Sequence, residues 1–189
     1  QLIPHPKADA HKDGRLADEG LLADRAALWE GLADGSISVA ATDHCSFSLA
    51  QKRERGKESV LDCPGGVPGV ETRIPLLFSE GVLHGRLTLP RFVDVVSTSP
   101  ARIRGLASTG RLEPGADADI VVIDPTDGRL IKTRNLHQKA DCTPYEGMVV
   151  RGWPRHVWLR GEPIIFGRQP SGMQDREGSF RGRSRAIKK

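Results

Sequence analysis

Aromatic side chains are scarce in this sequence, at 5% of 189 residues, although the hydrophobic fraction is 38%. Any core must therefore consist mainly of aliphatic side chains, and a chain of this length suffices for one domain or two small ones. No apolar run approaches the roughly 20 residues that cross a bilayer, so we expect no membrane partner. The sequence begins with Gln1 rather than Met, which we interpret as a sign of a fragment.

Cysteine is also rare. Cys45, Cys63 and Cys142 are odd in number and widely spaced, and no C-x-x-C pair occurs. This arrangement excludes a disulfide framework and a cysteine-based zinc site. Reduced thiols are typical of cytosolic proteins, so we expect a cytoplasmic protein.

The net charge of +4 is concentrated at one end, because residues 168–189 hold seven Lys or Arg and two acids. This Gly/Ser/Arg-rich segment is typical of a solvated or partner-docking tail. A basic excess also suits nucleic-acid binding. No aromatic platform or known motif supports that hypothesis, however, so we expect no nucleic-acid partner.

The N-terminal half has the rhythm of an α/β fold. Residues 1–19 are predicted to form a loop, and leucines at helical spacing predict a helix over residues 20–34 that Gly35 stops. The uninterrupted run of small and β-branched residues from Ile37 to Thr42 predicts a strand covered on both faces. Helix, turn, buried strand and then polar residues are typical of an α/β barrel or a doubly wound sheet.

A long polar loop follows over residues 46–69, and loops of this length are usually functional or disordered. A helix is predicted over residues 71–81 and ends at Gly81. A second helix is predicted after Thr88, with Pro90 in its first turn and Phe92, Val93 and Val96 on one face. A third is predicted from Ser99–Pro100 to Gly105.

The C-terminal part is predicted to be rich in short strands. These are expected at 120–123, stopped by Asp124–Pro125, and at 148–150, 157–159 and 164–166, with a turn at 160–162. The change of character predicts a domain boundary near residue 107, with the helical region 1–107 before it, a small β-rich layer over 108–167 after it, and the basic tail over 168–189.

Asp43 is the first candidate for chemistry, because it follows a predicted buried strand, where barrel enzymes hold their active sites. A carboxylate there can ligate a metal and accept a proton, or it can merely cap a loop. His44 should point the opposite way and be structural. Gly65 and Gly66 can bring backbone close to a ligand, or they belong to an ordinary flexible loop.

Other candidates are weaker. Cys45 and Cys63 lack a base placed to activate them, so neither is expected to be a nucleophile. No H-x-H or H-E-x-x-H pattern occurs, and a complete metal site needs several ligands. The residues alone therefore indicate an α/β unit with one suggestive aspartate.

Several ordered motifs over residues 25–167 resemble the dihydropyrimidinase and D-hydantoinase family of cyclic amidohydrolases. They are T-D-H-C-S-F-S-L-A-Q-K (42–52), P-G-G-V-P-G-V-E-T-R (64–73), G-V-L-H-G-R-L-T (81–88), S-T-S-P-A-R-I-R-G-L (97–106), G-A-D-A-D-I-V-V-I-D-P (115–125), T-P-Y-E-G (143–147) and V-R-G-W-P-R-H-V-W-L-R-G (150–161).

The resemblance implies the C-terminal portion of a (β/α)8 barrel beside part of a β-sandwich, in an intact enzyme that holds two metals, usually zinc, and forms a homotetramer. It implies that Asp43 is a metal ligand and moves the proton from the metal-bridging hydroxide, which opens the ring of a dihydropyrimidine or hydantoin. The family's Asn–Gly pair, whose main chain binds substrate, corresponds to Gly65–Gly66. The other metal ligands have no counterpart here, so the fragment alone is expected to be inactive.

Two alternatives remain. The allantoinase and dihydroorotase branch shares the chemistry but fits the C-S-F and A-Q-K wording less well. Non-catalytic dihydropyrimidinase-related scaffold proteins share the fold but tend to carry a non-acidic residue at the position of Asp43, so Asp43 favours an enzyme.

Overall fold

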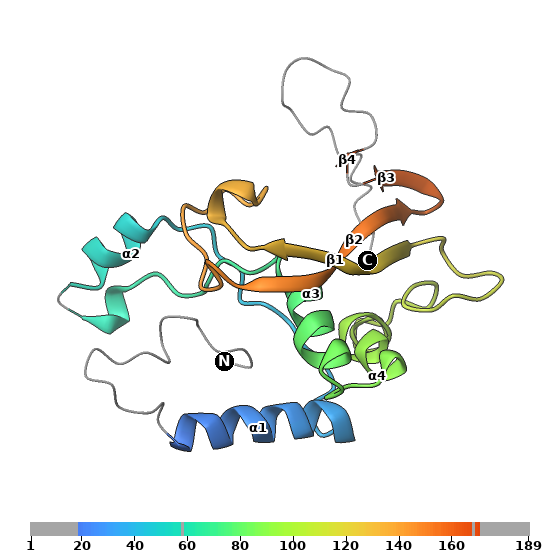
Figure 1. Cartoon of the computed structure of the whole chain (residues 1–189), viewed down its shortest axis with the longest axis horizontal. Coiled ribbons are helices and arrows are strands. Elements are labelled where there is room, and N and C mark those ends of the chain that lie inside the picture. Colours follow the sequence, from blue (N-terminus) through green and yellow to red (C-terminus); the bar gives the residue numbers. More distant parts are fainter. Residues whose placement is uncertain (1–18, 58, 168, 171–189) are drawn as a thin grey trace, which may run out of the picture.

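Figure 1 shows the computed structural model, which describes residues 19–57, 59–167 and 169–170. The first 18 residues and most of the basic tail therefore lie outside the described residues, together with the predictions made for them. The helical elements are α1 (Glu19–Asp34), α2 (Leu49–Arg55), η1 (Val60–Asp62), α3 (Arg73–Leu77), η2 (Phe78–Leu83), α4 (Leu89–Val93), η3 (Asp94–Thr98), α5 (Ser99–Ile103) and η4 (Thr133–Asn135). The strands are β1 (Ile120–Leu130), β2 (Val149–Leu159), β3 (Glu162–Phe166) and β4 (Gln169–Pro170).

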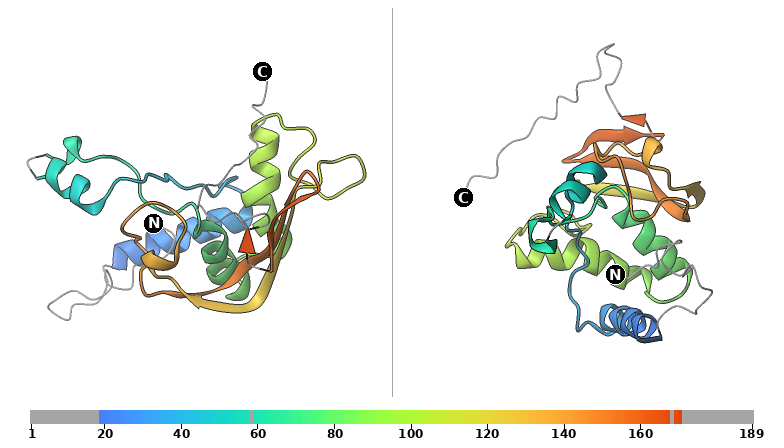
Figure 2. Two further views of the ribbon diagram at one scale, coloured as in Figure 1. Left: turned by 90° about the horizontal axis from the view of Figure 1, so that it is seen from above. Right: turned by 90° about the vertical axis from the view of Figure 1, so that its left-hand side faces the viewer.

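The strands form one antiparallel sheet in the order β1-β2-β3-β4. The helical run from α3 to α5 packs beneath it, with α3 and η2 against β2, and α1 lies on the side of that run away from the sheet (Figures 1 and 2). Helix α2 and its loop project to one side (Figure 2). Helices and strands are thus combined in one layered unit, which confirms the α/β class.

A single cluster of buried side chains joins these layers. Its members are Trp29, Leu32, Ala40, Leu76, Leu77, Phe78, Leu87, Phe92, Val95, Ile131, Val150 and Trp153. Phe78 and Phe92 meet edge to face, with ring centroids 5.5 Å apart, an arrangement that aromatic rings prefer.

The three tryptophans lie on α1 and at two places along β2. Trp29 belongs to α1 and carries the Arg86 guanidinium 5.4 Å from its ring centroid. Trp153 is buried on β2 and carries Arg129 at 5.1 Å. Trp158, near the other end of β2, has the ring of Phe166 at 6.5 Å.

Local signals predicted several elements correctly. Helix α1 covers the predicted segment, and Gly35 follows it with a φ of +99° that favours glycine. The Thr88 hydroxyl accepts a hydrogen bond from the Arg91 N–H at 3.3 Å, capping α4 as expected. The expected turn joins β2 to β3, with positive φ at Arg160 and Gly161.

The strand predicted at 37–42 was wrong, because residues 38–48 are neither helix nor strand. A parallel strand exists only through hydrogen bonds to neighbouring strands, and no such neighbour occurs among the described residues. The segment is instead held by helices, as shown below.

Several predicted boundaries also need correction. The helical run from Arg73 continues to Leu83, and Gly81 lies inside it, where a Cβ would come within 3.2 Å of the Trp29 ring. Val93, which is predicted on the buried face of the helix after Thr88, is 42% exposed, and Val95 is fully buried instead. The spacing Phe92, Val95 gives the buried face its helical period.

Helix and strand limits predicted at Ser99, Pro125 and the centre of β2 were wrong as well. The helical run passes through Ser99 without a new start. β1 continues past Pro125 with a bulge between Asp124 and Gly128, and β2 is one strand where two were predicted. A bulge accommodates residues that do not pair with the partner strand.

We expect the isolated chain to self-associate. Apolar side chains of the sheet such as Val149 and Phe166 are 66% and 62% exposed, and exposed apolar surface tends to associate with other chains. Light scattering after size-exclusion chromatography should show a mass above 20.6 kDa, reduced by Phe166→Lys. A monodisperse monomer with a cooperative thermal transition contradicts this prediction.

Candidate functional site

The backbone that leads into Asp43 is fixed by helices. The Ile37 N–H donates to the Gly31 carbonyl at 2.8 Å, and the Ala40 N–H donates to the Val95 carbonyl at 3.1 Å. On the other side of the same residue, the Arg73 guanidinium donates to the Ala40 carbonyl at 2.7 Å. These contacts present Asp43 at the end of a well-anchored segment.

Asp43 lies directly against Gly66. The Val67 N–H donates to the Asp43 carbonyl oxygen at 2.8 Å. A Cβ on Gly66 would lie 2.6 Å from that oxygen and 2.7 Å from the Cβ of Cys45, and Gly66 has a φ of +80°. Only glycine fits this conformation and approach, so the fold brings two of the candidate residues together.

Gly65 faces open space beside this contact. No heavy atom beyond Gly65 itself and its two chain neighbours lies within 4 Å of the position that its Cβ would take. Among residues 19–57, 59–167 and 169–170, the N–H groups of Gly65 and Gly66 have no hydrogen-bond acceptor. Two backbone donors are therefore available next to the exposed Asp43.

His44, for which a structural role is predicted, contacts neighbouring parts of the chain through both ring nitrogens. Its Nδ1 accepts a hydrogen bond from the Gly69 N–H at 3.2 Å, and its Nε2 lies 3.3 Å from the Ser46 hydroxyl. An accepting Nδ1 leaves the proton of the neutral ring on Nε2. His44 thus ties the glycine-rich segment to the residues that follow Asp43.

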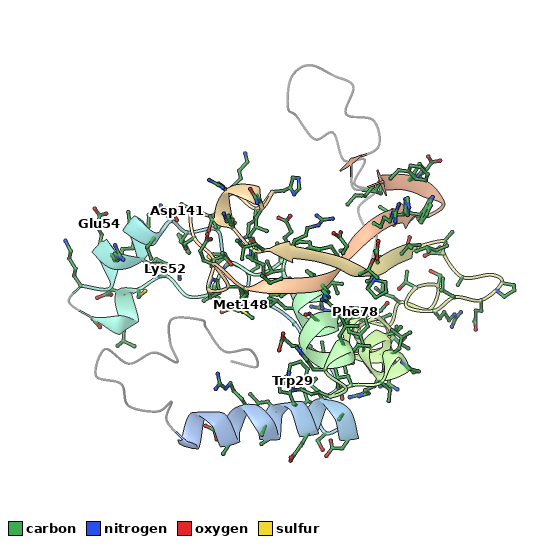
Figure 3. The ribbon with its side chains drawn as sticks, in the orientation of Figure 1. Trp29, Lys52, Glu54, Phe78, Asp141 and Met148 are labelled. Atoms are coloured by element: carbon green, nitrogen blue, oxygen red, sulfur yellow. The ribbon has the colours of Figure 1, made fainter. Side chains whose placement is uncertain are left out.

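Lys52 is a contact that the sequence did not predict. A reciprocal Ser48–Gln51 capping box starts α2, and the Leu49 N–H donates to Asp141 at 2.8 Å. One turn later, the Lys52 ammonium donates to the carbonyls of Pro64 at 2.5 Å and Gly66 at 2.7 Å. Lys52, on α2, and Asp141, beside that helix, lie away from Trp29 and Phe78 in the body of the molecule (Figure 3).

The described residues do not form a complete metal site. Within them, no group of three or more His, Cys, Asp or Glu side chains could hold a metal ion, so Asp43 offers one carboxylate ligand.

Burial, with the neighbouring Asp141 carboxylate, raises the pKa of the Cys142 thiol, which therefore stays protonated near neutral pH. The described part of the chain has no helix long and apolar enough to cross a membrane.

The site is open rather than enclosed. A hollow of about 520 Å³ elsewhere is lined by Lys132, Thr133, Arg134, Asp141, Cys142, Thr143 and Glu146, not by Asp43 or the glycine pair. Asp43 and Gly65 are both exposed.

A model of the amidohydrolase family matches residues 7–164, and the chain belongs to this family. Within it, the chain is similar to the D-phenylhydantoinases of Escherichia coli O1:K1 / APEC and of Escherichia coli strain K12 / DH10B. Each is 49% identical over 139 residues, which are 73% of this chain and 30% of the relative.

Solved structures give the same result. The dihydropyrimidinase of Brevibacillus agri NCHU1002 matches with a TM-score of 0.76 and 34% identity, over 87% of this chain and 35% of that one. The D-hydantoinase (dihydropyrimidinase) of Thermus sp. matches with a TM-score of 0.74 and 39% identity, over 77% and 32%. The chain thus spans about a third of the length of the proteins it matches.

Proposed function

We propose that this chain is part of a metal-dependent hydrolase that opens cyclic amides of the hydantoin or dihydropyrimidine type. The observation that carries the proposal is the contact between Asp43 and Gly66, which sets a carboxylate beside unengaged backbone donors. A carboxylate can accept a proton, and N–H groups can bind an amide carbonyl. The names of the similar proteins support the same substrate class.

Each residue has a definite role in this proposal. Asp43 contributes one metal ligand and moves a proton, and the main chain of Gly65–Gly66 binds the ring of the substrate. The intact subunit would hold two zinc ions, with the other ligands outside the described residues. A bound divalent metal supplies the acidity that makes water a nucleophile near neutral pH.

The architecture proposed for the intact protein follows the same family. Residues 1–107 would complete a (β/α)8 barrel, residues 108–167 would form part of a β-sandwich, and 168–189 would be a tail. The intact enzyme would be a cytoplasmic homotetramer, a location supported by the three free cysteines.

A non-catalytic scaffold protein is the second candidate function, because it would share the fold and the oligomeric assembly. The acidic residue at position 43, accessible beside Gly66, favours the enzyme. The allantoinase and dihydroorotase branch is less favoured, because the similar proteins reported above carry hydantoinase and dihydropyrimidinase names.

We expect the purified 189-residue chain, supplied with zinc, not to turn over hydantoin or dihydrouracil. One carboxylate cannot hold the metal that the reaction needs. Ring opening is measured through the loss of substrate and the appearance of the carbamoyl product. Turnover by the chain alone would falsify this expectation.

A chimera tests the function itself. The matched 139-residue segment would replace its counterpart in the Escherichia coli D-phenylhydantoinase, which supplies the rest of the protein. An enzyme segment should give a folded chimera that opens hydantoin rings. A folded, zinc-bearing chimera without turnover would instead favour the scaffold hypothesis.

A further inference from the structure

The Lys52 side chain binds the main chain of residues 64–66, called the glycine loop below. Its ammonium group has three N–H donors, and two of them bind the carbonyl oxygens of Pro64 and Gly66, at 2.5 and 2.7 Å. Hydrogen bonds from a charged donor are stronger than those between neutral groups. The half-buried Lys52 therefore fixes the Pro64–Gly65 and Gly66–Val67 peptide groups, which flank the Gly65–Gly66 peptide.

The direction of these peptide groups follows from peptide geometry. No cis peptide bond occurs in the described chain, and in a trans peptide the C=O and N–H point in opposite directions. Since the carbonyls of Pro64 and Gly66 converge on Lys52, the N–H groups of Gly65 and Val67 point away from it. The Val67 N–H does so and meets the Asp43 carbonyl at 2.8 Å.

We propose that Lys52 is a positioning residue, which turns the Pro64–Gly65 peptide so that the Gly65 N–H is presented to a cyclic amide carbonyl. This inference rests on the proposed function. Lys52 touches neither the substrate nor the reacting atoms. It acts through the two carbonyls, by preventing the glycine peptides from rotating, a freedom that glycine otherwise has.

Contacts other than those of Lys52 hold both ends of the glycine loop, so Lys52 is not needed to keep the loop attached. A Cβ on Gly56 would lie 3.2 Å from the Cβ of Cys63, so the end of α2 already presses against the chain before Pro64. His44 holds the far end through the Gly69 N–H. Loss of the Lys52 ammonium should therefore release the glycine peptides without detaching the loop.

The first test is amide hydrogen exchange on the full chain. Lys52→Met keeps an unbranched apolar stem, and Arg53→Met, on the exposed neighbour in α2, is the matched control. Lys52→Met should speed exchange at Val67 by about tenfold, the effect of losing a charge-assisted hydrogen bond, while Arg53→Met leaves it unchanged. Equal exchange in both variants overturns the proposal.

The second test is kinetic and uses the active chimera. Lys52→Met should raise KM for hydantoin about tenfold, the effect of one lost hydrogen bond, and change kcat less. Lys52→Arg, which can still donate to both carbonyls, should recover most of the loss. A fall in kcat with unchanged KM, or no recovery by arginine, overturns the positioning role.

The two tests also separate the inference from the proposed function. An inactive chimera rejects the hydrolase proposal, and with it the substrate role of the Gly65 N–H. The exchange result then still decides whether Lys52 orders the loop. An active chimera with unaltered KM in Lys52→Met rejects only the inference.

Discussion

Replacing Asp43 by Asn in the active chimera is expected to lower turnover by about 10²–10⁴-fold, the range for a lost proton-transfer group. The amide cannot accept a proton and is a weaker ligand for a doubly charged cation. The fold should survive, because the contact that Asp43 makes with Val67 uses its main-chain carbonyl, which Asn retains. Within the described residues, no hydrogen bond is made by the Asp43 carboxylate.

Turnover, zinc per chain and melting temperature are measured on one preparation. Zinc content should fall in part, because the other ligands remain. Asp62→Asn is the control, because Asp62 is also an exposed aspartate and lies in η1. This variant should change none of the three quantities. A loss of turnover well below about 10²-fold, the lower bound above, means that Asp43 is not the proton acceptor. An unfolded variant means that Asp43 is structural.

Gly152→Ala is expected to cause the largest loss of stability. Gly152 lies in β2 with a φ of +84°, and a Cβ there would lie 2.1 Å from Cδ1 of Phe78. A non-glycine residue in that conformation costs about 1–3 kcal/mol, and overpacking a core costs about 1–3 kcal/mol more. Phe78 cannot withdraw easily, because it also packs against Phe92.

Gly147→Ala separates the two costs. Gly147 has a nearly equal φ of +86°, but nothing lies within 4 Å of its Cβ position. Urea denaturation of both variants should show that Gly152→Ala is the less stable by about 1–3 kcal/mol, the overpacking cost alone. Equal losses would mean that Phe78 moves aside freely and that the layers are packed loosely.

The elements that the sequence predicted well depend on local chemistry. The Thr88 cap and the stop at Gly35 each involve residues within one turn of each other. The segment from Ile37 to Thr42 failed because its pattern describes burial on two faces, whereas a strand also needs hydrogen-bonded neighbours. Likewise, Pro125 wrongly predicts a strand end, because a bulge that accommodates it leaves no local pattern.

The candidate site also contains residues that the sequence predicts and a contact that only the fold reveals. Position and family resemblance predict Asp43 and Gly65–Gly66 as site residues, and the fold brings Asp43 and Gly66 into contact across a long loop. Their roles in the reaction stay predictions. Lys52 was missed because a side chain that binds main-chain carbonyls twelve or more residues away imposes no residue type on its partner. Only the three-dimensional loop reveals such a contact.

The placement of the tryptophans gives this chain three built-in optical probes. Trp29 reports on the attachment of α1 to the helical layer, because Arg86 lies over its ring. Trp153 reports on the buried contact between sheet and helices, and Trp158 on the far end of the sheet beside Phe166. Variants that keep one indole each would thus show, by fluorescence, whether these three contacts are lost together or in sequence during unfolding.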